Sequence, residues 1–289
     1  MADHPFVFAS DLHGREERYL KLLSFVREKR PQAVFLGGDL LPSGSLLFGK
    51  SGFSQGDFLK GFILPCLREL RADLKNEYPR FFLILGNDDA RSEEASLCRL
   101  EKEDLGEYVH MRKVPFGIYA IYGYSCVPPT PFSLKDWERY DVSRFVDPGA
   151  IPPEEGRYSV AVPDDEKGFP TIQEDLGTLG GRDPLDRAIF LFHSPPYQTL
   201  LDRAAMDGRK VDHVPLDVHV GSIAIKRFIE ERQPLVTLHG HVHESARLTG
   251  SWQDRIGRTY CFSAAHDGPE IAVVGFDPQE PERATRRLL

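Results

Sequence analysis

The chain has no run of about 18 consecutive apolar residues, the length that a membrane-spanning helix requires, so we expect no transmembrane segment. Its four cysteines are widely spaced and form no CxxC pair, which argues against a disulfide framework and against a zinc knuckle. The first residues lack a basic stretch followed by an apolar one, so we expect no secretory signal. These absences together predict a cytoplasmic protein with reduced thiols.

Positive charge is also scarce, because 36 Lys and Arg face 44 Asp and Glu, for a formal net charge of −8. This excess of acidic residues disfavours non-specific binding to long nucleic acids, whose phosphates attract basic surfaces. Apolar residues make up 41% of the 289 residues, which allows a sizeable core and argues against global disorder. Neither a membrane nor a long nucleic acid is therefore an expected partner, whereas a local basic pocket for a single phosphate is compatible with this charge.

Short apolar runs alternate with amphipathic stretches along most of the chain. We predict strands at 5–10, 33–37, 81–85, 117–122, 188–192, 235–238, 259–264 and 271–276. We predict helices at 16–29, at 55–76 with a kink or break at Pro65, from about Ser92, and at 221–232. This alternation indicates an α/β fold with largely parallel strands, in which ligands bind at the carboxyl ends of the strands.

One segment interrupts this pattern. The stretch 125–187 is rich in proline and in acidic residues, and within it residues 133–187 hold 7 Lys/Arg against 13 Asp/Glu. We interpret 1–289 as a single domain in which 125–187 is an insertion or lid over the site.

Five segments each place a metal-binding side chain at the end of a predicted strand. In chain order they are Ser10-Asp11-Leu12-His13-Gly14, Gly38-Asp39, Gly86-Asn87-Asp88-Asp89, His193 and Gly240-His241-Val242-His243. Their imidazole, carboxylate and amide groups suit divalent cations. Asp11 and His13 would point the same way in an extended segment, as would His241 and His243. Each motif alone could be a helix cap or a structural histidine, whereas the ordered set predicts a metal site.

These segments resemble the blocks DxH, GD, GNH(D/E), a lone His and GHxH of the calcineurin-like metallophosphoesterase superfamily. All five blocks occur in order over residues 11–243, the third with one substitution. The resemblance implies a four-layer α/β/β/α sandwich with two central mixed sheets. Residues 122–124 together with 128–132, and later 219–222, further resemble a prokaryotic Icc-type branch of the superfamily.

The resemblance also implies two divalent metal ions, with Mn²⁺ expected first and Fe or Zn²⁺ as alternatives. Carried over to this chain, the ligand sets are Asp11, His13, Asp39 and His243 for one metal and Asp39, Asn87, His193 and His241 for the other. Asp39 would bridge the two ions. By the same resemblance, a hydroxide between them would attack phosphorus in line. Bound dications lower the pKa of water, so this hydroxide would be available near neutral pH.

The third block departs from the family pattern, because Asp88 replaces the histidine that contacts the scissile phosphate and helps the leaving group depart. Asp89 matches the acid that orients this histidine in the family. A carboxylate beside two dications stays ionised, so Asp88 would have no proton to donate at pH 7. Three alternatives stay open: Asp88 acts through a bound water or cation, another side chain donates the proton, or the leaving group needs no acid.

The histidines available as proton donors are His213, His219 and His266, of which His219 lies close to a predicted helix start. We therefore name Asp88, Asp89 and His219 as candidate catalytic residues. The structural alternative for Asp88 and Asp89 is that they only favour the N-terminus of the following helix.

The sequence thus predicts a metal-dependent phosphoesterase that acts on a small phosphodiester or a nucleotide-type substrate. An alternative is a weakly active or inactive module of the same fold that acts in protein interaction. A site that has lost its catalytic activity would be expected to lose metal ligands as well, whereas all seven predicted ligand positions match the family pattern here. A third alternative, a nuclease, conflicts with the acidic charge of the chain.

Overall fold

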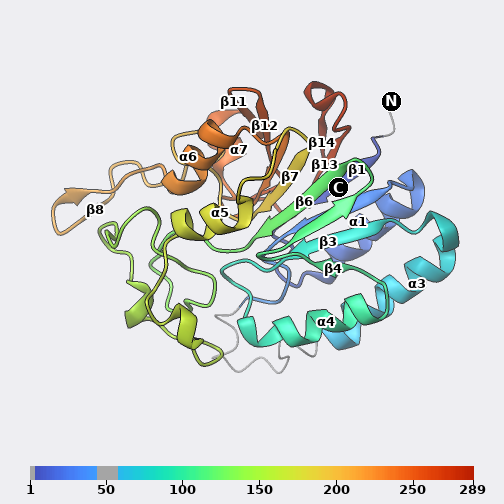
Figure 1. Cartoon of the computed structure of the whole chain (residues 1–289), viewed down its shortest axis with the longest axis horizontal. Coiled ribbons are helices and arrows are strands. Elements are labelled where there is room, and N and C mark those ends of the chain that lie inside the picture. The colour runs from blue at the N-terminus through green and yellow to red at the C-terminus, as the bar shows by residue number, and fades with distance from the viewer. Residues whose placement is uncertain (1–3, 44–57) are drawn as a thin grey trace.

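The computed structural model describes residues 4–43 and 58–289, which fold around two six-stranded β-sheets (Figure 1). In spatial order, the first sheet consists of β14 (Thr285–Leu288), β13 (Ala272–Phe276), β1 (Phe6–Ala9), β2 (Ala33–Gly37), β3 (Arg80–Ile84) and β4 (Glu107–Tyr108). The second consists of β11 (Gln253–Ile256), β12 (Thr259–Ser263), β10 (Val236–His239), β7 (Ala188–Phe192), β6 (Tyr119–Tyr124) and β5 (Lys113–Phe116).

Both sheets are mixed, with parallel strands at the centre. Strands β1, β2, β3 and β4 run parallel, and β13 joins β1 in the antiparallel direction. In the second sheet β12, β10, β7 and β6 run parallel, while β11 and β5 are antiparallel edge strands. Parallel strands place their carboxyl ends at one edge of a sheet, so the ends of β1, β2 and β3 meet, as do those of β7 and β10.

The two sheets pack face to face over an apolar layer. Alternate strand residues point into this layer, as Phe8, Phe35, Phe82, Leu191 and Phe262 do. Their neighbours along the strands, such as Val7, point outward and join the cluster that contacts the helices. Because the central strands are covered on both faces, they read as continuous apolar runs in the sequence.

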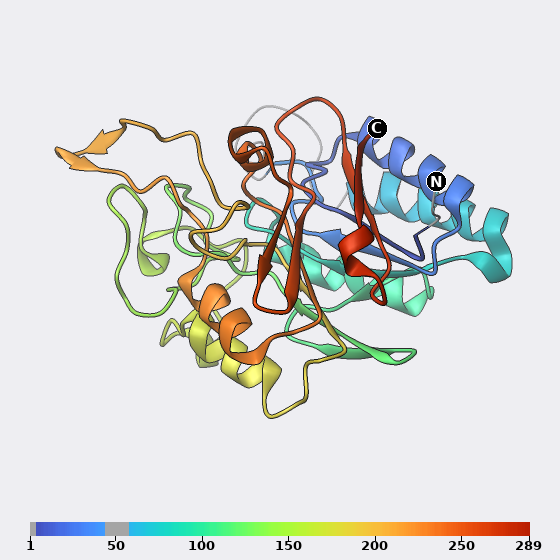
Figure 2. The same ribbon diagram turned by 90° about the horizontal axis from the view of Figure 1, so that it is seen from above.

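Helices cover the two outer faces. Helices α1 (Glu16–Lys29), α3 (Leu64–Leu74) and α4 (Glu94–Lys102) pack on the first sheet, and α5 (Ile172–Gly180) and α6 (Ile223–Arg232) pack against each other on the second. Figure 2 shows α1 and α3 on one side of the strands and α5 and α6 on the other. The predicted four-layer α/β/β/α sandwich is therefore confirmed. Among the described residues, no helix is both long and apolar enough to span a membrane.

The predicted strands agree with the structure to within two residues at each end, and the predicted helix 16–29 coincides with α1. The start of the predicted helix 55–76 lies outside the described residues. Its later part is a π-helical turn, Leu59–Ile63, followed by α3. Pro65 lies in the first turn of α3, where a proline is tolerated, so the expected break is a change of helical winding just before it.

Several short elements were not predicted. They are the strands β4, β5, β11 and β14, the hairpin of β8 (Lys210–Val211) and β9 (Val214–Pro215), the helices α5 and α7 (Ser245–Thr249), and 3₁₀ turns at Lys75–Glu77, Pro153–Glu155, Asp164–Glu166 and Pro281–Arg283. Two of these turns and α5 lie within 125–187, whose remaining residues are mostly irregular.

Candidate metal centre

The predicted metal ligands follow five central strands whose carboxyl ends face a common region. Asp11 and His13 follow β1, Asp39 follows β2, and Asn87 follows β3. His193 directly follows β7, and the pair His241 and His243 follows β10. The first sheet therefore contributes four of the predicted ligands and the second sheet three.

The backbone at these ligands is not extended, so our expectation for the DxH and HxH segments was wrong. Asp11, His13, Asp39 and His241 have left-handed φ angles of 57°, 49°, 51° and 73°. Side chains two residues apart therefore converge because the chain turns tightly, and not because of the two-residue period of a strand. Residues other than glycine rarely adopt this conformation, which concentrates at functional sites.

Backbone hydrogen bonds hold the first two ligand loops together. The Asp11 amide donates to the Gly38 carbonyl at 3.0 Å, and the His13 amide donates to the Asp39 carbonyl at 2.8 Å. Gly38 has a φ of 92°, and a Cβ atom there would lie 2.6 Å from Nδ1 of His193. Glycine at this position thus lets the backbone lie directly against a predicted ligand.

The first predicted ligand set is compact. Nε2 of His13 lies 3.2 Å from Nε2 of His243 and 3.9 Å from Oδ2 of Asp39. Nε2 of His243 lies 3.3 Å from Oδ1 of Asp11. One ligand atom from each of these four residues lies within 4.8 Å of the other three. Among the His, Cys, Asp and Glu side chains that the structure describes, this is the group that meets such a limit.

The second predicted set is more open. Nε2 of His193 lies 3.1 Å from Oδ1 of Asn87 and 3.4 Å from Oδ2 of Asp39. Nδ1 of His193 donates to the Gly37 carbonyl at 2.8 Å, which leaves Nε2 facing Asp39, where a bound cation would take the place of its proton. The rings of His241 and His193 lie edge to face with centroids 5.1 Å apart. Asp39 faces both sets, as a bridging ligand would.

The charges of the site call for a cation. Burial opposes ionisation of Asp11, but the hydrogen bond with His243 and the charges of His243 and His193 together outweigh burial and lower the pKa of Asp11 to about 2. Asp39 is also buried, and His193 holds its pKa far below the usual range. Burial opposes the charge on His13 and His193, yet neighbouring carboxylates raise the pKa of each to about 9. A divalent cation would supply the positive charge that protons on these imidazoles otherwise supply, so the donor set fits a metal.

The two acids of the altered third block have different surroundings. Asp89 is fully buried and accepts hydrogen bonds from the amides of Leu40, Leu41 and Gly86 at 3.0, 2.7 and 2.9 Å. Burial, with a contribution from Asp39, raises the pKa of Asp89 to about 7. This carboxyl group therefore fastens the loop after β3 to the loop after β2.

Asp88 lies at the predicted metal site and contacts a predicted ligand. Its Oδ2 is 3.4 Å from Nδ1 of His13, whose other ring nitrogen faces His243 and Asp39. The backbone amide of Asp88 donates to Oδ1 of Asp39 at 2.9 Å. The structure thus places Asp88 where a carboxylate would orient a metal-binding imidazole.

The three histidines considered as proton donors lie in different places. His213 is on the turn of the β8–β9 hairpin, which projects from the body of the molecule (Figures 1 and 2). Nδ1 of His219 lies 2.8 Å from Oδ1 of the buried Asp202. His266 lines a depression with His13 and His243, and its Nε2 is 3.2 Å from Oε2 of Glu270.

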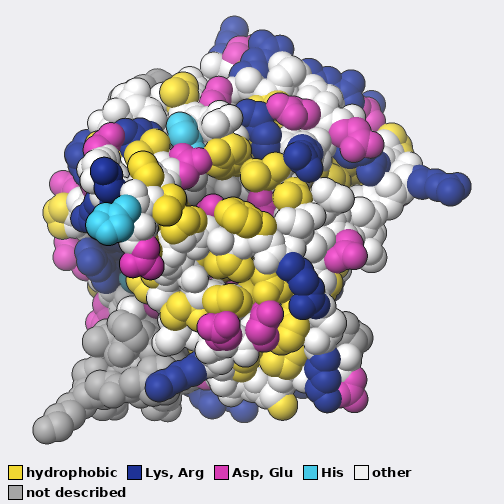
Figure 3. Space-filling model, turned by 90° about the vertical axis from the view of Figure 1, so that its left-hand side faces the viewer, with side chains coloured by type: hydrophobic (Ala, Val, Ile, Leu, Met, Phe, Trp, Pro, Cys, Tyr) yellow, Lys and Arg dark blue, Asp and Glu magenta, His cyan; other side chains and the backbone are white. Residues whose placement is uncertain are grey.

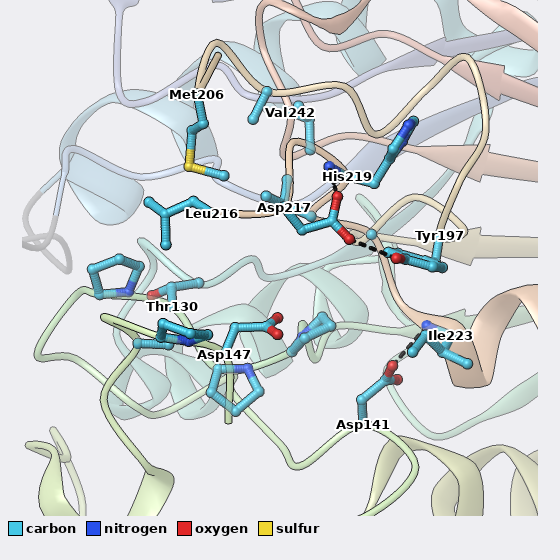
Figure 4. Close-up of a pocket in the computed structure, with 18 of the residues that line it drawn as sticks. Thr130, Asp141, Asp147, Tyr197, Met206, Leu216, Asp217, His219, Ile223 and Val242 are labelled. Carbon is cyan, nitrogen blue, oxygen red and sulfur yellow. Dashed lines mark hydrogen bonds between the residues drawn. The ribbon is translucent and has the colours of Figure 1, made fainter. Parts of the chain in front are cut away.

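Two cavities adjoin the predicted ligands. The larger, of about 540 Å³, meets the site at His241, and His219 also lines it (Figure 4). The smaller, of about 330 Å³, contains His13, His243 and His266. Glu244 and Ala205 line both, so the two cavities meet at these residues.

Sequence reasoning missed one residue that supports the site. Arg18 on α1 is buried and donates to the carbonyl of Asp11 at 2.6 Å and to that of Gly268 at 2.7 Å. It therefore ties the Asp11 loop to the chain after β12. An arginine directly beside the apolar stripe of a predicted helix, seven residues after Asp11, was the available signal.

The sequence and the fold of this chain are both similar to those of known proteins. Residues 4–245 match the sequence model of the calcineurin-like phosphoesterases. One crystal structure aligns over 98% of this chain and 98% of its own length, with a TM-score of 0.59 and 14% identity. The crystal structure of TT1561 of Thermus thermophilus aligns over 98% of this chain and 97% of its own, with a TM-score of 0.53 and 15% identity.

A dimetal phosphatase from Danio rerio aligns over 94% of this chain and 93% of its own, with a TM-score of 0.47 and 13% identity. A comparison with curated protein sequences finds no match. The likeness to the two structures with TM-scores above 0.5 shows a shared fold.

Proposed function

The chain belongs to the calcineurin-like phosphoesterase family, and on this premise we propose that it is a two-metal hydrolase of small phosphodiesters. Family membership itself makes it a metal-dependent hydrolase of phosphoester bonds. The observation that carries the finer proposal is the convergence of ligand atoms from Asp11, His13, Asp39 and His243 within 4.8 Å. Mixed imidazole and carboxylate donors of this kind suit Mn²⁺, Fe or Zn²⁺, and we expect Mn²⁺.

Two ligand sets follow from this proposal. The first metal would be held by Asp11, His13, Asp39 and His243, and the second by Asp39, Asn87, His193 and His241. When bound, the two cations would supply Lewis-acid activation of the phosphoryl group and of the attacking water. Asp39 would serve both cations, since its Oδ2 lies near His13 and near His193.

The residues around the ligands would act mainly by positioning. Asp88 would orient His13 through Nδ1, and Asp89 would fix the loop that carries Asn87. His219 is the candidate for proton donation, because Asp202 holds its Nδ1 and the ring lines the larger cavity. If His219 does not donate a proton, turnover would favour substrates with good leaving groups, since general acid catalysis typically contributes about 10²–10⁴-fold.

We further propose that 125–187 serves as a lid within a single domain. Residues between Pro128 and Ala150 form one wall of the larger cavity, and the metal loop after β10 forms part of another. A wall built from an insertion would set substrate choice while the metal site performs the reaction. We propose a cytoplasmic location because the cysteines are unpaired.

The test is hydrolysis of bis(4-nitrophenyl) phosphate and of 4-nitrophenyl phosphate by metal-stripped protein with and without added Mn²⁺. We expect Mn²⁺ to restore turnover, with the diester preferred. Asp39→Ala should abolish turnover, because it removes the carboxylate that both cations would share. Absence of turnover with Mn²⁺, Fe²⁺ and Zn²⁺, despite measured binding of two metals, would instead favour the interaction module.

A further inference from the structure

The larger cavity has a defined position relative to the predicted metal site. Its volume is about 540 Å³, in the range of small-molecule pockets. One wall comes from residues 128–150 and another from the chain between Tyr197 and Ile223. The cavity reaches the metal site at His241 and Val242. A phosphoester bound at the metals could therefore extend one of its ester groups into this space.

The lining of the cavity is largely apolar. Figure 4 shows Met206, Leu216 and Val242 on one side, facing Thr130 and Asp147. Phe132 and Phe145 line it as well and are 63% and 69% exposed, although aromatic side chains of this size are normally buried. Figure 3, which faces this end of the molecule, shows hydrophobic side chains gathered with acidic ones among them. Covering apolar surface of this kind with an apolar ligand lowers the free energy of the system and so favours binding.

The charged residues of the lining are mostly acidic. Asp147, Asp217 and Glu244 line the cavity, and Arg209 is the single Lys or Arg among the described residues that do so. Burial raises the pKa of the Asp147 carboxyl, and the nearby charge of Asp217 raises it further. A second phosphate or a carboxylate on the ligand would be repelled by these groups.

The walls are held in place without a ligand. Asp141 accepts hydrogen bonds from Oγ of Ser222 at 2.5 Å and from the amide of Ile223 at 2.6 Å, which ties the first wall to the start of α6. Asp202 holds the second wall through His219 and the amide of Gly221. A pocket that is already formed loses little entropy when it binds its ligand.

We propose that this cavity, here named the ester pocket, binds an apolar ester group without negative charge, such as an alkyl or aryl alcohol esterified to the phosphate. This inference rests on the proposed phosphodiesterase function and narrows its substrate class. It excludes nucleotide-type groups with further phosphates from the ester pocket.

The first test compares methyl 4-nitrophenyl phosphate with hexyl 4-nitrophenyl phosphate, which share the same leaving group. With Mn²⁺ bound, we expect kcat/KM for the hexyl ester to be at least about tenfold higher, since each buried methylene favours binding several-fold. The 5-carboxypentyl ester has nearly the same length but ends in a carboxylate, and it should be at least about tenfold poorer than the hexyl ester. The double variant Asp147→Asn with Asp217→Asn should reduce the difference in kcat/KM between the hexyl and the 5-carboxypentyl ester.

Phe145→Asp and Leu216→Asp place a charge on the wall of the ester pocket, and each should lower the hexyl-to-methyl ratio at least about fivefold. Ile118→Asp is the matched control, because Ile118 is also an exposed apolar side chain, 60% accessible, and does not line the cavity. It should leave the ratio unchanged. Melting temperatures of all variants separate a loss of folding from a loss of selectivity.

The outcomes distinguish the two proposals. If the methyl ester is hydrolysed but the hexyl ester shows no advantage, the ester pocket is wrongly assigned while the phosphodiesterase function stands. If no ester is hydrolysed, the proposed function fails, and calorimetric binding of monomethyl hexylphosphonate decides the assignment alone. Binding that Phe145→Asp weakens supports the ester pocket, and binding that is absent or unaffected by Phe145→Asp overturns it.

Discussion

At the residue scale, the predicted metal site is built on backbone conformations that most residues avoid. Asp11, His13, Asp39 and His241 have positive φ, at a typical cost of about 1–3 kcal/mol each. Backbone hydrogen bonds between the loops, such as that from the His13 amide to the Asp39 carbonyl, keep these conformations in place. The site is thus held in shape before any ligand arrives.

The contact between Asp88 and His13 makes a specific prediction about metal affinity. Asp88→Ala should weaken Mn²⁺ binding by about 10–100-fold, because an imidazole ligand that loses its carboxylate partner is less well oriented. Titration calorimetry on the metal-free protein measures this. Asp88→Asn keeps an oxygen that can accept a hydrogen bond from Nδ1 of His13, so its Mn²⁺ affinity should fall less than that of Asp88→Ala. Unchanged Mn²⁺ affinity in Asp88→Ala, together with reduced turnover, would show that Asp88 acts on the substrate instead.

At the scale of elements, the acidic segment 125–187 is anchored to the chain after β3 through two of its carboxylates. Both Nη atoms of Arg91 donate to Glu166 at 2.8 and 2.7 Å, and Arg139 also donates to Glu166. The Arg91 amide donates to Asp136 at 2.7 Å, which adds a second link. The segment that forms a wall of the ester pocket is therefore attached to the same loop that carries Asn87.

Glu166 should make the stability of the protein depend on acid pH. Burial opposes its ionisation, but Arg91 and Arg139 outweigh burial and lower the pKa of Glu166 to about 2 from 4.5. The stabilisation is complete above about pH 4.5 and is lost as the pH falls towards about 2. A shift of this size corresponds to about 3 kcal/mol.

Glu166→Gln should therefore be less stable than the wild type at pH 7 and should lose less stability on acidification. Urea unfolding at pH 7, 4 and 3 measures both effects. Glu155→Gln, on an exposed acid of the same segment, is the control and should follow the wild type. Parallel pH curves for Glu166→Gln and the wild type would contradict the anchoring role.

The elements that could be predicted are those whose buried position gives them an apolar composition. Strands such as β2 and β7 are apolar throughout because both faces are covered. The strands β11 and β14, with the sequences QDRI and TRRL, are polar edge strands and carry no such signal. Helix α5 contains glycines that hide its period, although Thr171 and Glu174 form a capping box that could have marked its start.

The predicted site divides in the same way. Ligand residue types and their order along the chain were readable, because Asp11 and the other predicted ligands follow apolar strands. The conformations of these residues were not readable, because left-handed φ at Asp11 or His13 is imposed by hydrogen bonds from distant loops. The ester pocket was not readable either, since it needs both 128–150 and the chain around Leu216.

At the scale of the whole molecule, the proposed metals would connect the two sheets. His13 follows β1 in the first sheet and His243 follows β10 in the second, yet their Nε2 atoms are 3.2 Å apart. A cation bound between them would be lost on unfolding, so binding should stabilise the native state by mass action.

Mn²⁺ at about 100 times its dissociation constant should therefore raise the free energy of unfolding by about 2.7 kcal/mol. Denaturant unfolding of metal-stripped protein, with and without Mn²⁺, measures the change. Asp39→Ala should show little gain, because it removes the carboxylate that faces both ligand sets. A gain of equal size in Asp39→Ala would place the stabilising metal elsewhere.

The distance along the chain between the two halves of the site has a consequence for synthesis. His13 and His243 are separated by 230 positions, so the entropy of closing this long loop must be overcome before the two imidazoles meet. A growing chain can complete the first ligand set only after β10 and the loop beyond it have left the ribosome. The full set of predicted ligands therefore exists only once the chain has been made to residue 243, and a nascent chain that stops earlier lacks His243 opposite His13.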